Sequence, residues 1–145
     1  MTQNQARDGR ARAIICDLDG TLALLTRRGP YEGHKCELDE LSEPIAHILK
    51  TYHEAGFAIV LVSGREDRHR RPTERWLAKH EVVYDCLFMR PTKDFRKDAI
   101  IKRKLYDREI RDRFEVFFVL DDRNQVVRMW RDLGLKCLQV ADGDF

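Results

Sequence analysis

The sequence predicts a doubly wound α/β fold around a five-stranded, mainly parallel sheet with flanking helices. Five short apolar runs alternate with four segments of helical periodicity. The runs cover residues 13–18, 57–63, 82–89, 116–120 and 136–141. Each run is apolar almost throughout, which is typical of parallel strands covered on both faces. Alternating strands and helices favour right-handed crossovers in one sheet, so we expect residues 11–145 to form a single domain behind a disordered lead-in of residues 1–10.

Four helices are predicted between these runs, each from apolar residues at helical spacing. They lie between residues 42 and 56, from residue 72 through 77, over 97–113 and over 124–133. Ser42 followed by Pro44 favours a helix start, and Gly56 favours a helix end. Trp76 and Trp130 fall on the apolar helix faces, so we expect both in the core.

The composition argues against a membrane protein and against a disulfide-stabilised secreted one. The chain has 145 residues, 43% of them hydrophobic, which suits one domain with a substantial core. No apolar run approaches the ~20 residues that span a bilayer, and the first residues are too polar for a secretory signal. The four cysteines lie far apart without a CxxC pair, which favours reduced thiols over disulfides or a zinc site. We therefore expect a cytoplasmic protein without membrane contact.

Charge is segregated along a chain whose formal net charge is only +2. Residues 64–75 carry five arginines against three acids, and residues 90–97 carry four basic residues against one acid. Residues 27–28 are both arginine. Basic loops of this kind suit a polyanionic ligand. Because few aromatic residues accompany them (Tyr31 and Phe95), we expect contacts to phosphate and backbone rather than extensive base stacking.

The polar residues that follow the predicted strands indicate phosphoryl chemistry. In an open parallel sheet, ligands bind beyond the carboxyl ends of the strands. The residues at these ends are Asp17, Asp19 and Thr21 after the first strand, Ser63, Gly64 and Arg65 after the second, Arg90 after the third, and Asp121 and Asp122 after the fourth. Clustered carboxylates imply a hard divalent cation, most simply Mg²⁺, and the arginines around them imply a phosphate. The sequence has no Walker-type loop, so nothing indicates an ATP-binding kinase site.

Four motifs in this sequence resemble those of haloacid-dehalogenase-type phosphatases. They are DLDGT (17–21), VSGR (62–65), RKDAIIK (96–102) and LDDR (120–123), in this order and at the predicted strand ends. Three further segments are similar to the 3′-phosphatase domain of phage-type polynucleotide kinase-phosphatases, namely RGPYE (28–32), DDRNQVVRMWRDLG (121–134) and CLQVADGDF (137–145). The resemblance implies a Mg²⁺-dependent phosphatase that removes 3′-phosphates from DNA or RNA ends in repair. The kinase domain of that family is missing from these residues, so a kinase partner, as a domain or a separate protein, stays open.

The resemblance also implies a role for each polar residue of the first two motifs. Asp17 is the expected nucleophile, which attacks phosphorus and forms an aspartyl-phosphate. Asp19 is the expected general acid and base. Residues two apart on a strand share a face, so both carboxylates can reach one phosphate. Thr21 and Ser63 would donate hydroxyl hydrogen bonds to that phosphate, with Gly64 beside them.

Lys102 is implied to neutralise Asp17 and the phosphate. It lies four residues after Asp98, so the two share a helix face, and Asp98 is implied to orient the lysine or an arginine. A plain surface ion pair between Asp98 and Lys102 would have the same spacing. The arginines implied to contact phosphate and nucleic acid are Arg28, Arg65 and Arg90.

The metal site is implied to combine the first and fourth motifs. Asp121 and Asp122 would complete it, together with Asp17 and the backbone carbonyl of Asp19. Side chains alternate along a strand, so Asp121 and Asp122 need not both point inward. We favour Asp122 as the direct ligand, with Asp121 close behind.

The spacing of the motifs leaves no room for a cap domain. Ser63 follows Asp17 by 46 positions and Lys102 follows Ser63 by 39, and a helix and a strand fill most of each interval. An open site suits a macromolecule, so nucleic-acid 3′ ends are the favoured substrate. A capless phosphatase for nucleoside monophosphates or other small phosphoesters is the alternative, and an end-binding module with a degenerate site is a third. The choice between DNA and RNA and the oligomeric state stay open.

Overall fold

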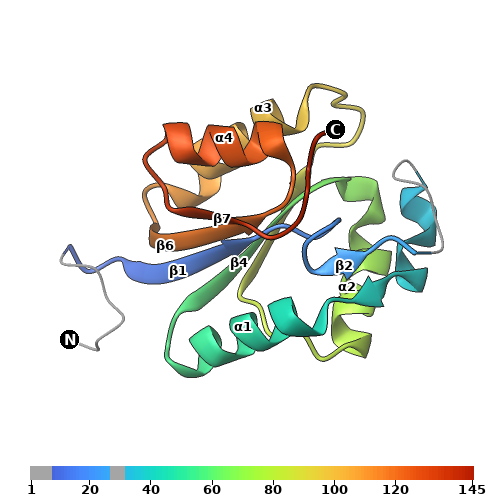
Figure 1. The fold of residues 1–145 in the computed structure, drawn as a ribbon, viewed down its shortest axis with the longest axis horizontal. Coiled ribbons are helices and arrows are strands. Elements are labelled where there is room, and N and C mark those ends of the chain that lie inside the picture. Colours follow the sequence, from blue (N-terminus) through green and yellow to red (C-terminus); the bar gives the residue numbers. More distant parts are fainter. Residues whose placement is uncertain (1–7, 27–31) are drawn as a thin grey trace.

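The computed structural model describes residues 8–26 and 32–145 and builds them around one parallel sheet (Figure 1). The sheet has five strands in the order β5-β4-β1-β6-β7, and every neighbouring pair is parallel. Its strands are β1 (Ala11–Cys16), β4 (Ala58–Glu66), β5 (Cys86–Arg90), β6 (Phe114–Asp121) and β7 (Cys137–Gln139). The predicted fold class is confirmed, and a strand lies in each of the five predicted runs, although the third begins at Cys86 rather than at residue 82. Because β1 is central, the residues that follow it lie between the ends of β4 and β6.

Four α-helices cover the two faces of the sheet, α1 and α2 on one face and α3 and α4 on the other (Figure 1). They are α1 (Glu43–Glu54), α2 (Arg70–Lys79), α3 (Asp98–Leu105) and α4 (Asn124–Asp132). Each face has its own apolar cluster. Trp76 packs with Leu49 in one cluster, and Trp130 packs with Ile101 in the other. Both tryptophans are at most 1% exposed, as predicted from their helix faces.

Two helix boundaries differ from the prediction. Helix α2 begins at Arg70, two residues before Pro72, directly after the short 3₁₀ helix η2 (Asp67–His69). Proline is tolerated throughout a first helical turn because its missing N–H has no intrahelical partner there. The predicted helix over 97–113 is interrupted, because α3 ends at Leu105 and a π-helical turn, η3 (Tyr106–Ile110), follows. The apolar spacing continues through that turn, so periodicity alone does not mark the change.

The chain segment that connects β1 to α1 contains two short strands, β2 (Ala23–Leu24) and β3 (Glu40–Leu41), which form a separate antiparallel pair. The 3₁₀ helix η1 (Gly33–Leu38) precedes β3 and packs against α2. Within residues 8–26 and 32–145, no inserted domain separates β1 from β4 or β4 from α3. The carboxyl edge of the sheet is therefore without a cap in the part of the chain that the structure describes. No helix in that part is long and apolar enough to cross a membrane.

Candidate active site

Asp17 follows β1 directly and is paired with Lys102. The Asp17 amide donates to the Leu120 carbonyl of β6 at 3.0 Å, which fixes the backbone at the strand end. The Lys102 ammonium donates to Asp17 Oδ1 at 2.6 Å and to Asp121 Oδ2 at 3.0 Å. Lys102 is 1% exposed and Asp17 is 5% exposed, so both charges are removed from water. Burial alone would lower the pKa of Lys102, but Asp121 and Asp17 outweigh it and raise that pKa well above its ordinary value.

Asp121 and Asp122 complete a carboxylate cluster with Asp17. One oxygen from each of the three residues lies within 4.8 Å of the others. Burial is the main reason that the pKa of Asp17 is raised well above its ordinary value, with Asp121 adding to the effect and Lys102 opposing it. Burial likewise raises the pKa of Asp122. Three carboxylates lie close together and, among the described residues, only the Lys102 ammonium compensates them, so the cluster has an excess of negative charge. A divalent cation would compensate this excess, so these residues fit a hard metal ion.

Hydrogen bonding separates the roles of the two adjacent acids. Oδ1 of Asp121 accepts from the Asp122 amide at 2.8 Å, and Oδ2 accepts from the Trp130 indole at 3.2 Å as well as from the buried lysine. Protein donors thus occupy both oxygens of Asp121. Asp122 accepts from the Thr21 hydroxyl at 3.3 Å through Oδ1, and its Oδ2 faces Gly20. Asp122 is therefore better placed than Asp121 to offer an oxygen to a metal.

Gly20 lets the DLDGT loop approach Asp122 closely. Its φ is +84°, and a Cβ at this position would lie 2.2 Å from Asp122 Oδ2. We expect Gly20→Ala to displace that carboxylate and to lower kcat/KM for phosphate release by about 100-fold, because a misplacement of an ångström can cost this much. Steady-state assays with saturating Mg²⁺ measure the effect.

Gly134 supplies a matched control for this substitution. Its φ is also +84°, but no atom lies within 4 Å of the position that a Cβ would take. Gly134→Ala therefore carries the same backbone strain, about 1–2 kcal/mol of stability, without the contact at the site. Equal losses of activity in the two variants would show that the approach to Asp122 does not matter.

Arg65, near the end of β4, is buried between two acids. Its Nε and Nη2 donate to Asp19 Oδ1 at 3.0 and 2.6 Å, and Nη2 also donates to Asp39 Oδ2 at 2.9 Å. Its Nη1 donates to the Thr73 hydroxyl at 3.1 Å. The side chain of Arg65 is 2% exposed and that of Asp39 is fully buried, whereas that of Asp19 is 32% exposed. Burial would lower the pKa of Arg65, but the carboxylates, Asp19 first, raise it on balance.

Two of these partners, Asp39 and Thr73, were not among the residues predicted from the sequence. Asp39 lies in an acid-rich stretch that is typical of a solvated loop. Its burial arises because η1 packs on α2, where the Trp76 indole donates to the Asp39 carbonyl at 2.9 Å. Thr73 is buried and donates to the His69 carbonyl at 2.8 Å while it accepts from Arg65. Thr73 and Asp39 bind Nη1 and Nη2 of Arg65, and so orient the guanidinium with Nε and Nη2 towards Asp19.

Asp39→Asn tests this support. The change keeps the shape but removes one of the charges that compensate the buried guanidinium, so we expect the free energy of unfolding to fall by about 1–3 kcal/mol. We expect kcat to fall about tenfold because Arg65 is held less firmly. Urea unfolding and steady-state assays measure both.

Glu37→Gln is the comparison for Asp39→Asn. It breaks the pair of Glu37 with Arg75, whose side chains are 45% and 61% exposed. An exposed pair of this kind contributes little to stability, because water screens both charges. If Asp39→Asn is no more costly than Glu37→Gln, Asp39 does not support Arg65.

Ser63 and Gly64 lie near the end of β4, beside Asp98. Ser63 is 1% exposed, and its hydroxyl accepts from the Arg65 amide at 3.0 Å. A Cβ on Gly64 would lie 2.0 Å from Asp98 Oδ1, so glycine permits this approach of α3 to β4. Asp98 Oδ2 lies 3.9 Å from the Lys102 ammonium. Asp98 and Lys102 are thus not the plain surface pair that their spacing also allowed, but an internal pair that connects the second and third motifs.

The remaining predicted residues lie in different settings. Thr21 is buried, and its hydroxyl donates to Asp17 Oδ2 at 3.1 Å, so it orients the carboxylates in this structure. Arg90 donates to the Gly64 carbonyl at 2.7 Å and to Asp98 Oδ1 at 3.3 Å, so it braces the loop after β5. Arg28 lies outside the described residues.

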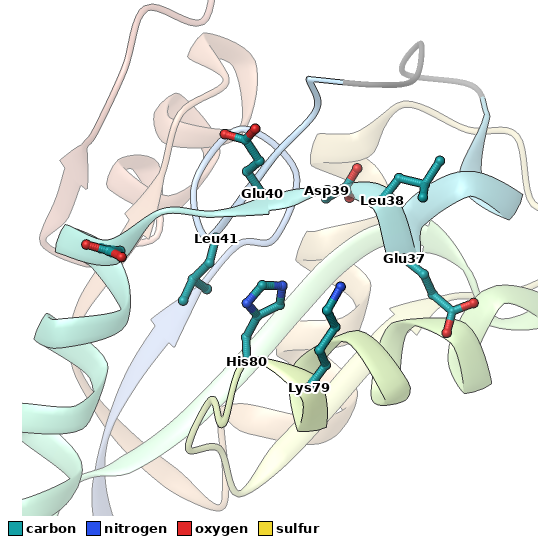
Figure 2. A pocket seen from close by; sticks show the side chains of 8 residues that line it. Glu37, Leu38, Asp39, Glu40, Leu41, Lys79 and His80 are labelled. Atoms are coloured by element: carbon teal, nitrogen blue, oxygen red, sulfur yellow. The ribbon is translucent and has the colours of Figure 1, made fainter.

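A hollow of about 370 Å³ lies between β3, η1 and the end of α2, apart from the carboxylate cluster. Figure 2 shows Leu41, His80 and Lys79 with side chains directed towards the same space. Its lining residues are Glu37, Leu38, Asp39, Glu40, Leu41, Glu43, Lys79 and His80. The hollow shares Asp39 with the surroundings of Arg65 but contains neither of the acids of the DLDGT motif.

The fold and this site together define a phosphatase of the haloacid dehalogenase type, in which a lysine-paired aspartate faces the open edge of a parallel sheet. Comparison with known families narrows the class. The chain belongs to the family described as the phosphatase domain of polynucleotide kinase PNKP, which matches residues 11–145. The resemblance inferred from the motifs is confirmed.

Individual relatives agree with this assignment. A predicted bifunctional polynucleotide kinase/RNA ligase of Autographa californica nuclear polyhedrosis virus is 41% identical over 129 residues, which cover 86% of this chain and 18% of that protein. The solved Pnkp1/Rnl/Hen1 complex contains a chain that is 49% identical with a TM-score of 0.93, and the match covers all of this chain and 50% of that one. This chain therefore spans half or less of the length of either relative. The tungstate-bound class C acid phosphatase from Bacillus anthracis, 15% identical with a TM-score of 0.68 over 92% of this chain and 67% of that one, shares the fold.

Proposed function

We propose that the chain is a Mg²⁺-dependent polynucleotide 3′-phosphatase that removes terminal 3′-phosphates from DNA or RNA through an aspartyl-phosphate. The observation that carries this proposal is the buried pair of Asp17 and Lys102, 2.6 Å apart, at the uncapped edge of the sheet. A nucleophilic carboxylate must be ionised although it is buried. The adjacent ammonium favours the ionised form against the effect of burial, and a bound divalent cation would favour it further.

The reaction proceeds in two displacements at phosphorus. An oxygen of Asp17 attacks, a new O–P bond forms, and the bond to the sugar 3′ oxygen breaks while Asp19 supplies the proton to that oxygen. Asp19 then takes a proton from the water that attacks the aspartyl-phosphate, which releases inorganic phosphate and restores Asp17. Lys102 favours the charged form of Asp17 and offsets the negative charge that develops beside it.

Asp19 has to leave its resting contact to act as an acid. In this structure it accepts from Arg65 at 2.6 Å, a contact that favours the ionised carboxylate. A phosphate binds a guanidinium in the same bidentate way as a carboxylate, so a bound substrate can compete with Asp19 for Arg65. Proton transfer is thereby coupled to occupation of the site.

Mg²⁺ fits the carboxylate cluster described above. Asp17 and Asp122 would hold it with their side chains and Asp19 with its backbone carbonyl, while Asp121 stays engaged with Lys102 and Trp130. When bound, the ion supplies charge neutralisation between the phosphate and the acids.

Two observations support a polynucleotide over a small phosphoester. The carboxyl edge is uncapped in the described part of the chain, and basic loops follow β4 and β5. The family is described as the phosphatase domain of a polynucleotide kinase, the viral relative is described as a polynucleotide kinase/RNA ligase, and one solved complex is described as an RNA repair complex. We accordingly propose a role in nucleic-acid end repair alongside a kinase or ligase activity, in the same chain or another. The four free cysteines, three of them buried, support a reducing, cytoplasmic setting.

A substrate panel tests the proposal. We expect rapid phosphate release from a 3′-phosphorylated oligonucleotide, slower release from a 3′-mononucleotide, and almost none from the 5′-phosphorylated oligonucleotide. Chelation should abolish the activity and added Mg²⁺ should restore it. Raising salt from about 50 to about 200 mM should weaken the oligonucleotide reaction much more than the mononucleotide reaction.

Three outcomes distinguish the candidates. Preference for a 5′-mononucleotide would establish the small-phosphoester alternative. Oligonucleotide binding without turnover would establish an end-binding module. Activity that survives chelation would contradict the metal requirement.

A further inference from the structure

Phe95 is a large apolar side chain presented to solvent in the loop that follows β5, at the carboxyl edge of the sheet. It is 82% exposed, more than any other large hydrophobic side chain among the described residues. It lies in the loop of residues 91–97 between β5 and α3, which we call the β5–α3 loop. A single exposed apolar side chain needs no partner by itself, so the significance of Phe95 depends on the loop that holds it and on the charges beside it.

The β5–α3 loop is held in one conformation around this ring. Arg90 Nη1 donates to the carbonyls of the residues on either side of Phe95, to Asp94 at 2.8 Å and to Arg96 at 2.5 Å. Lys93 has a φ of +68°, an unfavourable value for a residue with a side chain, and its amide donates to Glu66 at 3.1 Å. The strain persists because these contacts over-determine the loop. Phe95 is therefore a pre-organised feature of the surface.

The same arginine ties the loop to the catalytic residues. Arg90 Nε donates to the Gly64 carbonyl at 2.7 Å, and Nη2 donates to Asp98 Oδ1 at 3.3 Å. Asp98 in turn lies 3.9 Å from the Lys102 ammonium, which contacts Asp17 at 2.6 Å. Three ion pairs thus lead from Arg90 through Asp98 and Lys102 to the nucleophile. The loop therefore lies on the same edge of the sheet as the expected terminal phosphate.

The charges that flank Phe95 indicate the chemistry of its partner. Lys93, Arg96 and Lys97 lie within two residues of it in the sequence and are all exposed, although Arg96 also pairs with Asp94. An aromatic ring set among cations is the arrangement that binds single-stranded nucleic acid, because a base stacks on the ring while phosphates meet the cations. An apolar protein partner would not require cations around its contact residue.

We infer that Phe95 stacks on a base at or next to the 3′ end of the substrate and so selects polynucleotides over small phosphoesters. This inference rests on the proposed function. It assigns a single stacking position, in keeping with the few aromatic residues around the basic loops. Recognition is then independent of sequence, because every base has a π-face.

The test compares intact and abasic substrates. The substrates are 3′-phosphorylated oligonucleotides with a base-free residue at the first, second or third position from the end, and 4-nitrophenyl phosphate as a small phosphoester. For the unmodified oligonucleotide we expect Phe95→Ala to lower kcat/KM by about 10- to 100-fold, mostly through KM. The wild-type protein should lose a similar factor when the stacked base is missing, and Phe95→Ala should be indifferent to its removal.

Two further variants separate stacking from other effects. Phe95→Trp should retain the oligonucleotide activity, whereas Phe95→Leu, which keeps an apolar side chain without a π-face, should resemble Phe95→Ala. Phe117→Ala serves as the matched control, because Phe117 is a phenylalanine on β6 that is 41% exposed and lies outside the site. It should leave both the oligonucleotide and the 4-nitrophenyl phosphate reactions unchanged.

The possible results differ for each explanation. The inference is supported if removal of the stacked base lowers kcat/KM for the wild-type protein but not for Phe95→Ala, while Phe95→Ala still hydrolyses 4-nitrophenyl phosphate. Wild-type oligonucleotide kinetics in Phe95→Ala, or an equal loss on both substrate types, overturns it while the proposed function stands. A wild-type protein that cleaves 4-nitrophenyl phosphate but no 3′-phosphorylated oligonucleotide overturns the proposed function and the stacking role with it.

Discussion

Asp17→Asn is expected to abolish phosphate release while leaving the protein folded. The amide cannot attack phosphorus, so kcat should fall by at least about four orders of magnitude, as it does when an enzyme loses its covalent nucleophile. The fold should survive because Lys102 keeps its contact with Asp121 at 3.0 Å, and because removal of one charge relieves repulsion within the carboxylate cluster. We expect an unchanged or slightly raised Tm.

Single-turnover assays with a labelled 3′-phosphorylated oligonucleotide measure this loss, and acid quenching shows whether a covalent phosphoprotein accumulates. Asp107→Asn is the control, because Asp107 forms exposed helix pairs with Arg103 and Arg111, away from the carboxylate cluster. It should retain full activity. Phosphate release by Asp17→Asn at more than about 1% of the wild-type rate would refute the assignment of the nucleophile.

The sequence was sufficient to place the carboxylates because local patterns determine where strands end. The apolar run up to Cys16 predicts a buried strand, and the fold rules bring the ends of parallel strands to one edge. Asp17 therefore had to lie near Asp121 and Asp122 once both runs were assigned to one sheet, although over 100 positions separate them. The resemblance added the chemical roles to this placement.

Other features depend on packing that no local pattern records. The spacing of Asp98 and Lys102 fits a surface ion pair equally well, and only the docking of α3 on β4 makes Lys102 fully buried. The support of Arg65 by Asp39 arises from the contact of η1 with α2, which joins segments far apart in the chain. The bond of the Trp130 indole to Asp121 likewise adds a polar role to a residue predicted only as core.

The distinction between Asp121 and Asp122 shows the same limit at the scale of one residue. Alternation along a strand leaves both candidates open, because the strand ends between them and the chain turns. The hydrogen bonds favour Asp122 as the ligand, because protein donors engage both oxygens of Asp121, whereas Asp122 Oδ2 lies beside the small Gly20. These donors come from residues distant in the chain or from the local backbone turn, so the sequence alone could not show which acid has an oxygen left for a metal ion.

Lys102→Met should cause a larger loss of stability than any of the other substitutions proposed above. Methionine fills a similar volume, but Asp17 and Asp121 would then be left buried, close together and without their cation. Breaking a buried ion pair from one side typically costs about 3–5 kcal/mol, and we expect a loss in this range for the metal-free protein. Urea unfolding in the presence of chelator measures it, and phosphate release should be lost as well.

Lys104→Met controls for the loss of a lysine from α3, because Lys104 is exposed on the same helix. It should change the free energy of unfolding by under about 0.5 kcal/mol. The double variant Lys102→Met/Asp121→Asn provides the decisive comparison, since it removes the cation together with one of the charges that it compensates. If the loss comes from uncompensated carboxylates, the double variant should be more stable than Lys102→Met alone, a non-additivity that neighbouring charges produce. A double variant that is less stable than Lys102→Met would instead mean that packing around the lysine stem, rather than its charge, stabilises the edge of the sheet.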